Sequence, residues 1–204
     1  GRLAGGLSRT HPFSASGVET WASCPFHYFL GRVLDVEPTE RPEDAESWTI
    51  SPIDRGSLIH GILEEFFRTL HEAGRPGPAE TFSTADHDLL RVIANRRFRQ
   101  VEDLGQTGYQ LAWQNTQAAI MLDLETVLSR DEDFRAENAV KPEYFEQGFG
   151  FEEGWPAAEV SLSDGTVVRP CGNIDRVDRG DGIADVTDYK TGSGYAKQEF
   201  EADP

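Results

Sequence analysis

The chain has 204 residues, 38% of them hydrophobic, which is enough to bury the core of one ordinary domain. Its net charge of −17, from 19 basic and 36 acidic residues, opposes strong nucleic-acid binding by the chain alone. No apolar run approaches the roughly 18 residues that cross a bilayer, and no charged-then-apolar leader opens the sequence, so we expect a soluble protein that is not exported. Its two cysteines, Cys24 and Cys171, should be reduced.

Two short helices are predicted near the start of the chain. Ser16 and Glu19 have the spacing of a capping box, which would begin the first helix. Pro25 interrupts that helix, and a second one is expected over 26–33. Its apolar side chains are expected to face inward: Phe26, Phe29, Leu30 and Val33.

Three longer helices should follow a loop at 37–52 that is rich in proline, glutamate and serine. The first runs from 54 or 55 to about 72 and ends at Gly74. Its apolar positions fall on one helical stripe: Leu58, Ile59, Ile62, Leu63, Phe66, Phe67 and Leu70. Two further helices are predicted near 84–103 and 107–130, and the second carries Trp113, Ile120, Met121, Leu124, Val127 and Leu128.

After Pro142 the apolar period changes from that of a helix to that of a strand. Asp-Gly and Gly-Asp-Gly turn signals separate the segments. Five strands are predicted, at about 143–150, 157–162, 165–170, 171–178 and 182–190. Helices followed by an antiparallel meander indicate an α+β fold.

We expect residues 1–204 to form a single domain in three parts. These are about 12–52, with the N-terminal helices and Cys24, then 53–135, which is helical, and 140–200, which forms the sheet. The chain begins with glycine, turns polar after Gly192 and supplies no closing helix for the second face of the sheet. We therefore expect a piece of a longer protein.

The strongest chemical signal is Cys171-Gly-Asn-Ile-Asp175-Arg-Val-Asp178, followed by Asp188-Tyr189-Lys190-Thr191-Gly192. Because strand side chains alternate, Asp188 and Lys190 should lie on one face, about 6–7 Å apart along the strand. If Asp175 projects from the neighbouring strand onto that face, two carboxylates and an ammonium group converge. Such a constellation suits a divalent cation and the hydrolysis of a phosphodiester.

His60 has two interpretations. It lies four residues before Glu64, on the same helical face, beside the apolar stripe. A half-exposed histidine without a chemical role is common at such an edge. Alternatively, the neutral imidazole ligates a metal ion, and Gly56 one turn earlier leaves room for a ligand or a closely packed strand. The acidic residues and the lysine favour this second interpretation.

Asp175, Asp178 and Asp181 recur at intervals of three residues. An EF-hand calcium loop needs acids at every second position and a glycine at the sixth, so this spacing excludes it. Asp178 and Asp181 are better explained as turn residues that pair with Arg176 and Arg179.

Taken together, these motifs resemble the RecB-like branch of the PD-(D/E)XK nucleases. The similarity also includes Gly56-x-x-x-His60 and Glu146-x-x-Phe149-Gly150. Ser14-x-Ser16 leading to Cys24-Pro25-Phe26 resembles specifically the C-terminal nuclease domain of AddB-type helicase–nuclease subunits. The resemblance covers roughly residues 12–200 and implies a mainly antiparallel central sheet of the restriction-endonuclease-like type.

The resemblance implies four ligands for Mg²⁺ or Mn²⁺: His60, Asp175, Asp188 and the main-chain carbonyl of Tyr189. Lys190 would orient the attacking water and steady the charge on the phosphate, acting together with the two aspartates. Glu146 would lie behind these ligands or face the substrate. Hard oxygen ligands with one imidazole are compatible with either cation.

The family pattern also makes Cys24 the first ligand of a [4Fe–4S] cluster. The other three cysteines, and a Gln-x-x-x-Tyr helix that contacts substrate, would lie beyond the end of this sequence. We therefore expect the cluster in a longer parent protein and not in this chain, whose own nuclease activity would be weak or absent. Cys171 is expected to be a small buried hydrophobic residue.

The implied function is that of a metal-dependent DNA nuclease, with exonuclease activity as the expected mode. It would act on single-stranded ends during double-strand-break repair and recombination in the bacterial cytoplasm, together with a helicase subunit or a helicase-like region of the same protein. One alternative is an inactive module that binds DNA ends or a partner, and another is an acidic domain that binds metal without cleavage. The lysine argues against the first alternative, because binding alone would not require it.

Overall fold

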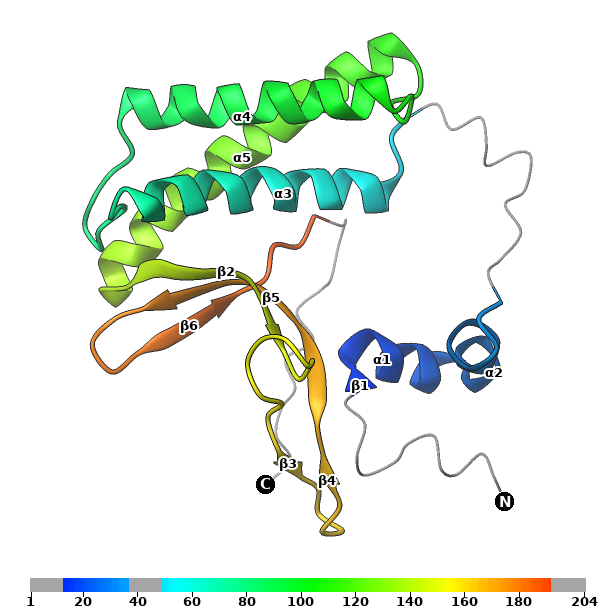
Figure 1. The fold of residues 1–204 in the computed structure, drawn as a ribbon. Coiled ribbons are helices and arrows are strands. Elements are labelled where there is room, and N and C mark those ends of the chain that lie inside the picture. Colours follow the sequence, from blue (N-terminus) through cyan, green and yellow to red (C-terminus); the bar gives the residue numbers. More distant parts are fainter. Residues whose placement is uncertain (1–12, 37–48, 192–204) are drawn as a thin grey trace.

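The computed structural model describes residues 13–36 and 49–191. Its helices are α1 (Ala15–Ser23), α2 (Pro25–Tyr28), the π-helical turn η2 (Phe29–Val33), α3 (Pro52–Glu72), α4 (Thr84–Asp103) and α5 (Gln110–Asn138). Its strands are β1 (Phe13–Ser14), β2 (Lys141–Phe149), β3 (Val160–Ser161), β4 (Val167–Val168), β5 (Pro170–Arg179) and β6 (Ala184–Thr187). The helices α3, α4 and α5 form a layer over β2, β5 and β6, while α1 and α2 lie beside β1 and β5 (Figure 1). The α+β architecture is as predicted.

The long strand β5 organises the sheet. Along one side it pairs antiparallel with β2, from Arg179 opposite Lys141 to Gly172 opposite Phe149. Along the other side its second half pairs antiparallel with β6, and its first two residues pair parallel with β1. The strands β3 and β4 form a separate ribbon. The sheet is mainly antiparallel, as predicted, but it is more than a meander because β1 joins it from the start of the sequence.

The core is built around α3, whose predicted apolar stripe is buried at all seven positions. The Ser51 side chain accepts a hydrogen bond from the Asp54 amide, and Pro52 opens the helix, so the helix begins with a normal cap. Phe66 and Phe67 pack against Phe82 with ring centroids 5.6 and 6.2 Å away. This packing fixes α3 against α4 and α5, and it sets the position of everything that α3 carries.

Helix α5 is longer than the prediction of 107–130, because buried charges continue its apolar stripe. The buried positions are Ile120, Leu124, Leu128, Asp131 and Arg135, at helical spacing. Arg135 Nε donates to Asp131 Oδ2 at 2.6 Å, and both side chains are buried. The helix ends at Ala139, which has a left-handed φ of 53°. A prediction based on apolar residues alone therefore ends this helix too early.

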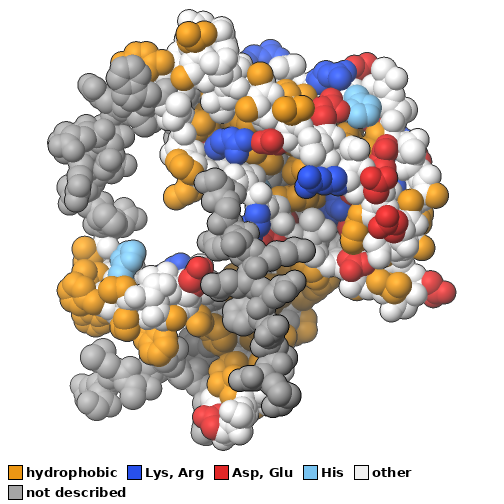
Figure 2. Space-filling model, turned by 180° about the vertical axis from the view of Figure 1, so that it is seen from behind, with side chains coloured by type: hydrophobic (Ala, Val, Ile, Leu, Met, Phe, Trp, Pro, Cys, Tyr) orange, Lys and Arg blue, Asp and Glu red, His pale blue; other side chains and the backbone are white. Residues whose placement is uncertain are grey.

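The N-terminal prediction was partly wrong. Ser14, rather than Ser16, caps α1, because its side chain accepts a hydrogen bond from the Gly17 amide. Phe26 and Val33 were expected to face inward, but they are 68% and 51% exposed. Hydrophobic side chains cover much of this unit in Figure 2, where it lies at the left of the view. The physical reason is that the main contacts of this segment with the rest of the described chain are those of α1 with β1 and β5.

Some predicted features fall outside the described residues. These are most of the loop at 37–52 and the polar segment after Thr191. Among the described helices, none combines the length and apolar character needed to cross a membrane.

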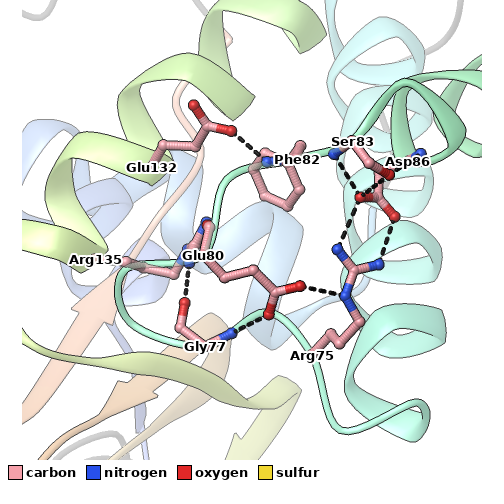
Figure 3. A network of polar contacts seen from close by, with 8 residues as sticks. All are labelled: Arg75, Gly77, Glu80, Phe82, Ser83, Asp86, Glu132 and Arg135. Atoms are coloured by element: carbon pink, nitrogen blue, oxygen red, sulfur yellow. Dashed lines mark hydrogen bonds and ion pairs between the residues drawn. The ribbon is translucent and has the colours of Figure 1, made fainter.

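The connector between α3 and α4 is held by a bidentate ion pair (Figure 3). Arg75 Nη1 and Nη2 donate to the two oxygens of Asp86, at 2.8 and 2.9 Å, and Arg75 Nε also donates to Glu80. Asp86 accepts from the amide and hydroxyl of Ser83, at 2.7 Å each, and so completes a capping box for α4. The Asp86 carboxylate is thus almost fully buried among donors.

Helix α5 holds the other end of the same connector. Arg135 Nη1 donates to the Gly77 carbonyl, and Nη2 donates to the Glu80 carbonyl at 2.8 Å. The Arg135 guanidinium also lies 5.1 Å from the centre of the Phe82 ring, and Glu132 accepts from the Phe82 amide. The three long helices therefore meet through charged groups as well as through the apolar core.

The pair formed by Arg75 and Asp86 predicts a loss of stability in acid. The hydrogen bonds from Arg75 lower the pKa of Asp86 from 3.8 to about 2. A carboxyl whose pKa is depressed in the folded state stabilises that state above its unfolded pKa, and this contribution is lost as the pH falls through the folded pKa. The free energy of unfolding should therefore drop by about 2 kcal/mol between pH 4 and pH 2 on account of this group.

Urea titrations across this pH range would check the prediction. Asp86→Asn should be less stable than wild type at pH 6 and should lose less stability on acidification. Asp88→Asn, an exposed residue on the same helix, is the matched control and should keep the wild-type fall. If the free energy of unfolding falls equally with pH in wild type and in Asp86→Asn, the pair of Arg75 and Asp86 does not cause the loss of stability in acid.

Candidate metal centre

His60 lies on α3 at the edge of the buried stripe, and its side chain is 27% exposed. One turn earlier, a Cβ at Gly56 would come within 3.0 Å of the Thr191 hydroxyl. Arg55 Nη1 also donates to the Thr191 carbonyl at 3.4 Å. The segment after β6 can therefore run close to α3 because position 56 has no side chain. The room that the sequence indicated beside Gly56 is used by this segment.

Tyr189 joins His60 to Asp175 through its main chain. His60 Nε2 lies 2.6 Å from the Tyr189 carbonyl oxygen, and the Tyr189 amide donates to Asp175 Oδ2 at 2.6 Å. Since a carbonyl can only accept, the hydrogen bond requires the proton on Nε2. A neutral His60 then presents the lone pair of Nδ1, which lies 3.4 Å from Asp175 Oδ2. The main chain of Tyr189 therefore ties the His60 side chain to Asp175.

Glu146 brings a second carboxylate to the same place. Ligand atoms of His60, Glu146 and Asp175 all lie within 4.8 Å of one another. The residues that flank Glu146 in β2 pair in register with those that flank Asp175 in β5, so the two acids face each other across the ladder. The φ of Glu146 is 47°, a left-handed conformation that non-glycine residues rarely adopt. Such strain is concentrated at functional sites.

Asp188 and Lys190 form an ion pair beside this cluster. Asp188 Oδ2 lies 2.5 Å from Lys190 Nζ, and the two side chains are 53% and 66% exposed. Both residues follow the end of β6 at Thr187, so the strand predicted at 182–190 is too long and strand alternation does not account for their pairing. Within the described part of the chain, Asp188 stands outside the group whose ligand atoms lie within 4.8 Å of each other. Because Asp188 is exposed, its carboxylate can turn between Lys190 and the cluster.

The two inner acids are held in conditions that oppose their ionisation. Burial raises the pKa of Asp175, and the charge of Asp188 adds to this effect, whereas the Tyr189 amide and His60 act against it. Burial also raises the pKa of Glu146, and the charges of Asp175 and Glu64 raise it further. Carboxylates placed so close together repel each other unless a positive charge enters between them.

The residues present fit a divalent cation. Carboxylate oxygens with one imidazole and a nearby main-chain carbonyl are the donors that suit Mg²⁺ or Mn²⁺. A bound cation would relieve both the repulsion between Asp175 and Glu146 and the cost of their burial. The structure brings together His60, Asp175 and Glu146, which the sequence analysis had expected behind the ligands or facing the substrate.

The interpretation of Asp178 as a turn residue was wrong. Asp178 is fully buried in β5, where Arg176 Nη2 donates to it at 2.8 Å. Asp181 does lie in the turn between β5 and β6, while Arg179 Nη1 is 3.6 Å from Glu143. Arg176 and Asp178 are two positions apart in β5, so their side chains share one strand face. This spacing of opposite charges could have indicated a buried ion pair.

The two cysteines occupy different environments. Cys24 is exposed and caps α2, since its sulfur accepts from the His27 amide at 3.4 Å. Cys171 is buried in β5 opposite Ser14, as expected for a small hydrophobic residue. A [4Fe–4S] cluster needs four ligands, usually cysteines, and the sequence contains two, one of them buried. This chain by itself does not fit a cluster.

Comparison with known families settles the class of the chain. The model of the PD-(D/E)XK nuclease superfamily matches residues 12–204. The chain belongs to this superfamily. Helices followed by a mainly antiparallel sheet, with acids on paired strands, are thus the framework of a PD-(D/E)XK domain, and the predicted fold is confirmed.

Similarity to individual proteins is more distant. The B subunits of the ATP-dependent helicase/deoxyribonuclease from Clostridium botulinum strain Hall and from Clostridium acetobutylicum are each 26% identical to this chain, over 189 and 188 residues. In both cases the match covers 88% of this chain and 15% of the relative. The corresponding protein of Caldanaerobacter subterraneus is 25% identical over 192 residues. The chain is therefore a PD-(D/E)XK domain distantly related to AddB-type subunits, and it spans about 15% of their length.

The position of Glu146 in this PD-(D/E)XK domain predicts a direct contribution to metal binding. Glu146→Gln removes one negative charge from the inner cluster but keeps its shape, so the affinity for Mn²⁺ should fall at least roughly tenfold, or about 1.4 kcal/mol. Isothermal titration calorimetry would measure this change. Glu143→Gln on the same strand is the matched control, because Glu143 faces Arg179 instead of the cluster. If Glu146→Gln binds Mn²⁺ as tightly as wild type does, Glu146 does not contribute to the metal site.

Proposed function

We propose that this chain is a metal-dependent deoxyribonuclease domain that hydrolyses phosphodiester bonds in single-stranded DNA. The observation that carries the proposal is the convergence of His60, Glu146 and Asp175 within 4.8 Å, next to the ion pair of Asp188 and Lys190. Residues 1–204 form one nuclease domain, with the parts at about 12–52, 53–135 and 140–200. Membership of the PD-(D/E)XK superfamily supports the class of reaction.

Each residue has a role in the proposed reaction. A divalent cation, Mg²⁺ or Mn²⁺, would be held by four groups: His60, Asp175, Asp188 and the carbonyl of Tyr189. Its binding would replace the hydrogen bond between His60 Nε2 and that carbonyl. When bound, it activates a water molecule and stabilises the charge that develops on the phosphate. Lys190 orients that water and offsets charge on the scissile phosphate. Glu146 lies close to Asp175, and this proximity supports a contribution of its carboxylate to binding the cation.

The proposed substrate follows from the relatives and from the charge of this chain. The relatives carry both helicase and deoxyribonuclease in their names, so a motor activity accompanies the nuclease in those proteins. We infer that this domain receives single-stranded ends from such a motor, as an exonuclease in recombinational repair in the bacterial cytoplasm. Because the net charge of the chain is −17, most contacts with the DNA phosphates would come from other parts of the assembly. Cys24 would serve a [4Fe–4S] cluster in the longer protein.

The proposal predicts that Asp188→Ala and Lys190→Ala abolish cleavage without unfolding the domain. Both side chains are more than half exposed, so their loss should leave the melting temperature within a few degrees of wild type. Loss of a metal ligand or of the lysine should slow the reaction by at least roughly a hundredfold. The test uses the natural full-length protein with Mg²⁺ and end-labelled single-stranded DNA.

Asp181→Ala and Lys141→Ala are the matched controls, since each removes an exposed charge of the same kind elsewhere on the sheet. Both should cleave at the wild-type rate. Persistent cleavage by Asp188→Ala and Lys190→Ala would dismiss the catalytic assignment. Binding of DNA ends with no cleavage by the wild-type protein, Mg²⁺ being present, would instead indicate an inactive binding module.

A further inference from the structure

Behind Asp175, the next residue of β5 points into a buried cluster of charges. Arg176 is 3% exposed, and its Nη2 lies 2.6 Å from Asp131 Oδ1 on α5. Arg176 Nε and Nη2 also donate to Asp178 Oδ2, at 3.2 and 2.8 Å. Asp131 in turn accepts from Arg135. Two acids and two arginines therefore balance each other between the helical layer and the sheet.

The same guanidinium packs against the residue that bridges the metal centre. Arg176 Cζ lies 4.4 Å from the centre of the Phe67 ring and 5.9 Å from the centre of the Tyr189 ring. On its other side the Tyr189 ring meets the His60 ring edge-on, with centroids 5.8 Å apart. The Tyr189 hydroxyl is buried and makes no hydrogen bond to any described residue. Packing between Arg176 and His60, and not the hydroxyl, therefore positions the Tyr189 side chain.

These contacts connect Arg176 to both inner ligands of the cation. Asp175 is its neighbour in the chain, and the main chain of Tyr189 binds Asp175 through its amide and His60 through its carbonyl. We propose that Arg176 is a positioning residue for the metal centre: held by Asp131 and Asp178, it fixes β5 and Tyr189 against α3. The inference rests on the proposed function, because the spacing of His60 and Asp175 matters chemically only if they hold a cation.

Stability alone is a poor explanation for this cluster. Removing four charges from water is costly, and buried ion pairs can often be replaced by apolar residues without loss of stability. An arginine fixed by two carboxylates and stacked on an aromatic ring, by contrast, has little freedom to move. Fixed geometry is what a cation site needs, since ligands displaced by about an ångström bind weakly.

The test uses the full chain with Arg176→Met and Asp178→Asn combined. This double variant removes one charge of each sign and leaves the pair of Asp131 and Arg135 intact, so the buried charges stay balanced. The fold should be retained, while the affinity for Mn²⁺ falls at least tenfold. The Tyr189 amide, followed by NMR, should exchange with solvent at least tenfold faster, because its bond to Asp175 loosens.

Two further variants separate positioning from stability. Arg176→Lys keeps the charge but loses the planar stacking and two of the five N–H donors, so it should recover part of the affinity for Mn²⁺. Arg75→Met combined with Asp86→Asn removes a comparable ion pair from the connector between α3 and α4. This control should lower stability while leaving the affinity for Mn²⁺ and the Tyr189 exchange rate unchanged.

The proposal is overturned if the double variant folds and keeps both the Mn²⁺ affinity and the slow exchange of the Tyr189 amide. If the double variant does not fold, Arg176→Lys decides: unchanged affinity and exchange in that variant overturn the proposal, and a loss in both supports it. If the wild-type chain binds no Mn²⁺, the proposed function fails. The exchange of the Tyr189 amide then still shows whether Arg176 positions β5.

Discussion

The site depends on the two hydrogen bonds made by the main chain of Tyr189. One joins the segment after β6 to α3 through His60, and the other joins it to β5 through Asp175. Main-chain groups have fixed directions, so a histidine and an aspartate far apart in sequence come to lie 3.4 Å from each other. Gly56 favours this arrangement because a Cβ there would lie only 3.0 Å from the Thr191 hydroxyl. The helical layer and the sheet thus meet at the point where the chemistry is proposed.

At the end of α5, buried charged side chains replace the apolar side chains that form the core. Near its middle, α5 packs through leucine and isoleucine, but its last turns use Asp131 and Arg135 on the same stripe. Asp131 then reaches across to Arg176 on β5, while Arg135 reaches the connector between α3 and α4. A single helix therefore fixes both the strand that carries Asp175 and the helix that carries His60. Directional contacts of this kind hold elements in register more strictly than apolar packing does.

The sequence predicted well what depends on local periodicity and poorly what depends on distant partners. The stripe of α3 was correct at every position, because burial along one helix face repeats every three to four residues. The end of α5 was misjudged because Asp131 gives no sign of burial until its partner Arg176 on β5 is known. The burial of Asp178 was overlooked although Arg176 lies two positions earlier on the same strand. The left-handed φ of Glu146 could not be predicted either, because no residue type indicates such strain. The strand predicted at 182–190 ends at Thr187, so the ion pair of Asp188 and Lys190 belongs to the segment after β6 and does not follow from strand alternation.

Charge balance indicates how many cations the proposed site takes. When ionised, Glu146, Asp175 and Asp188 carry three negative charges against the single positive charge of Lys190, with His60 taken as a neutral ligand. Two negative charges remain, which one divalent cation neutralises. A phosphodiester carries a negative charge of its own, so without a cation it would be repelled by this cluster across the few ångströms that separate them. The acids that on their own repel DNA are therefore the same groups that, with one cation bound, allow a phosphate to approach Lys190.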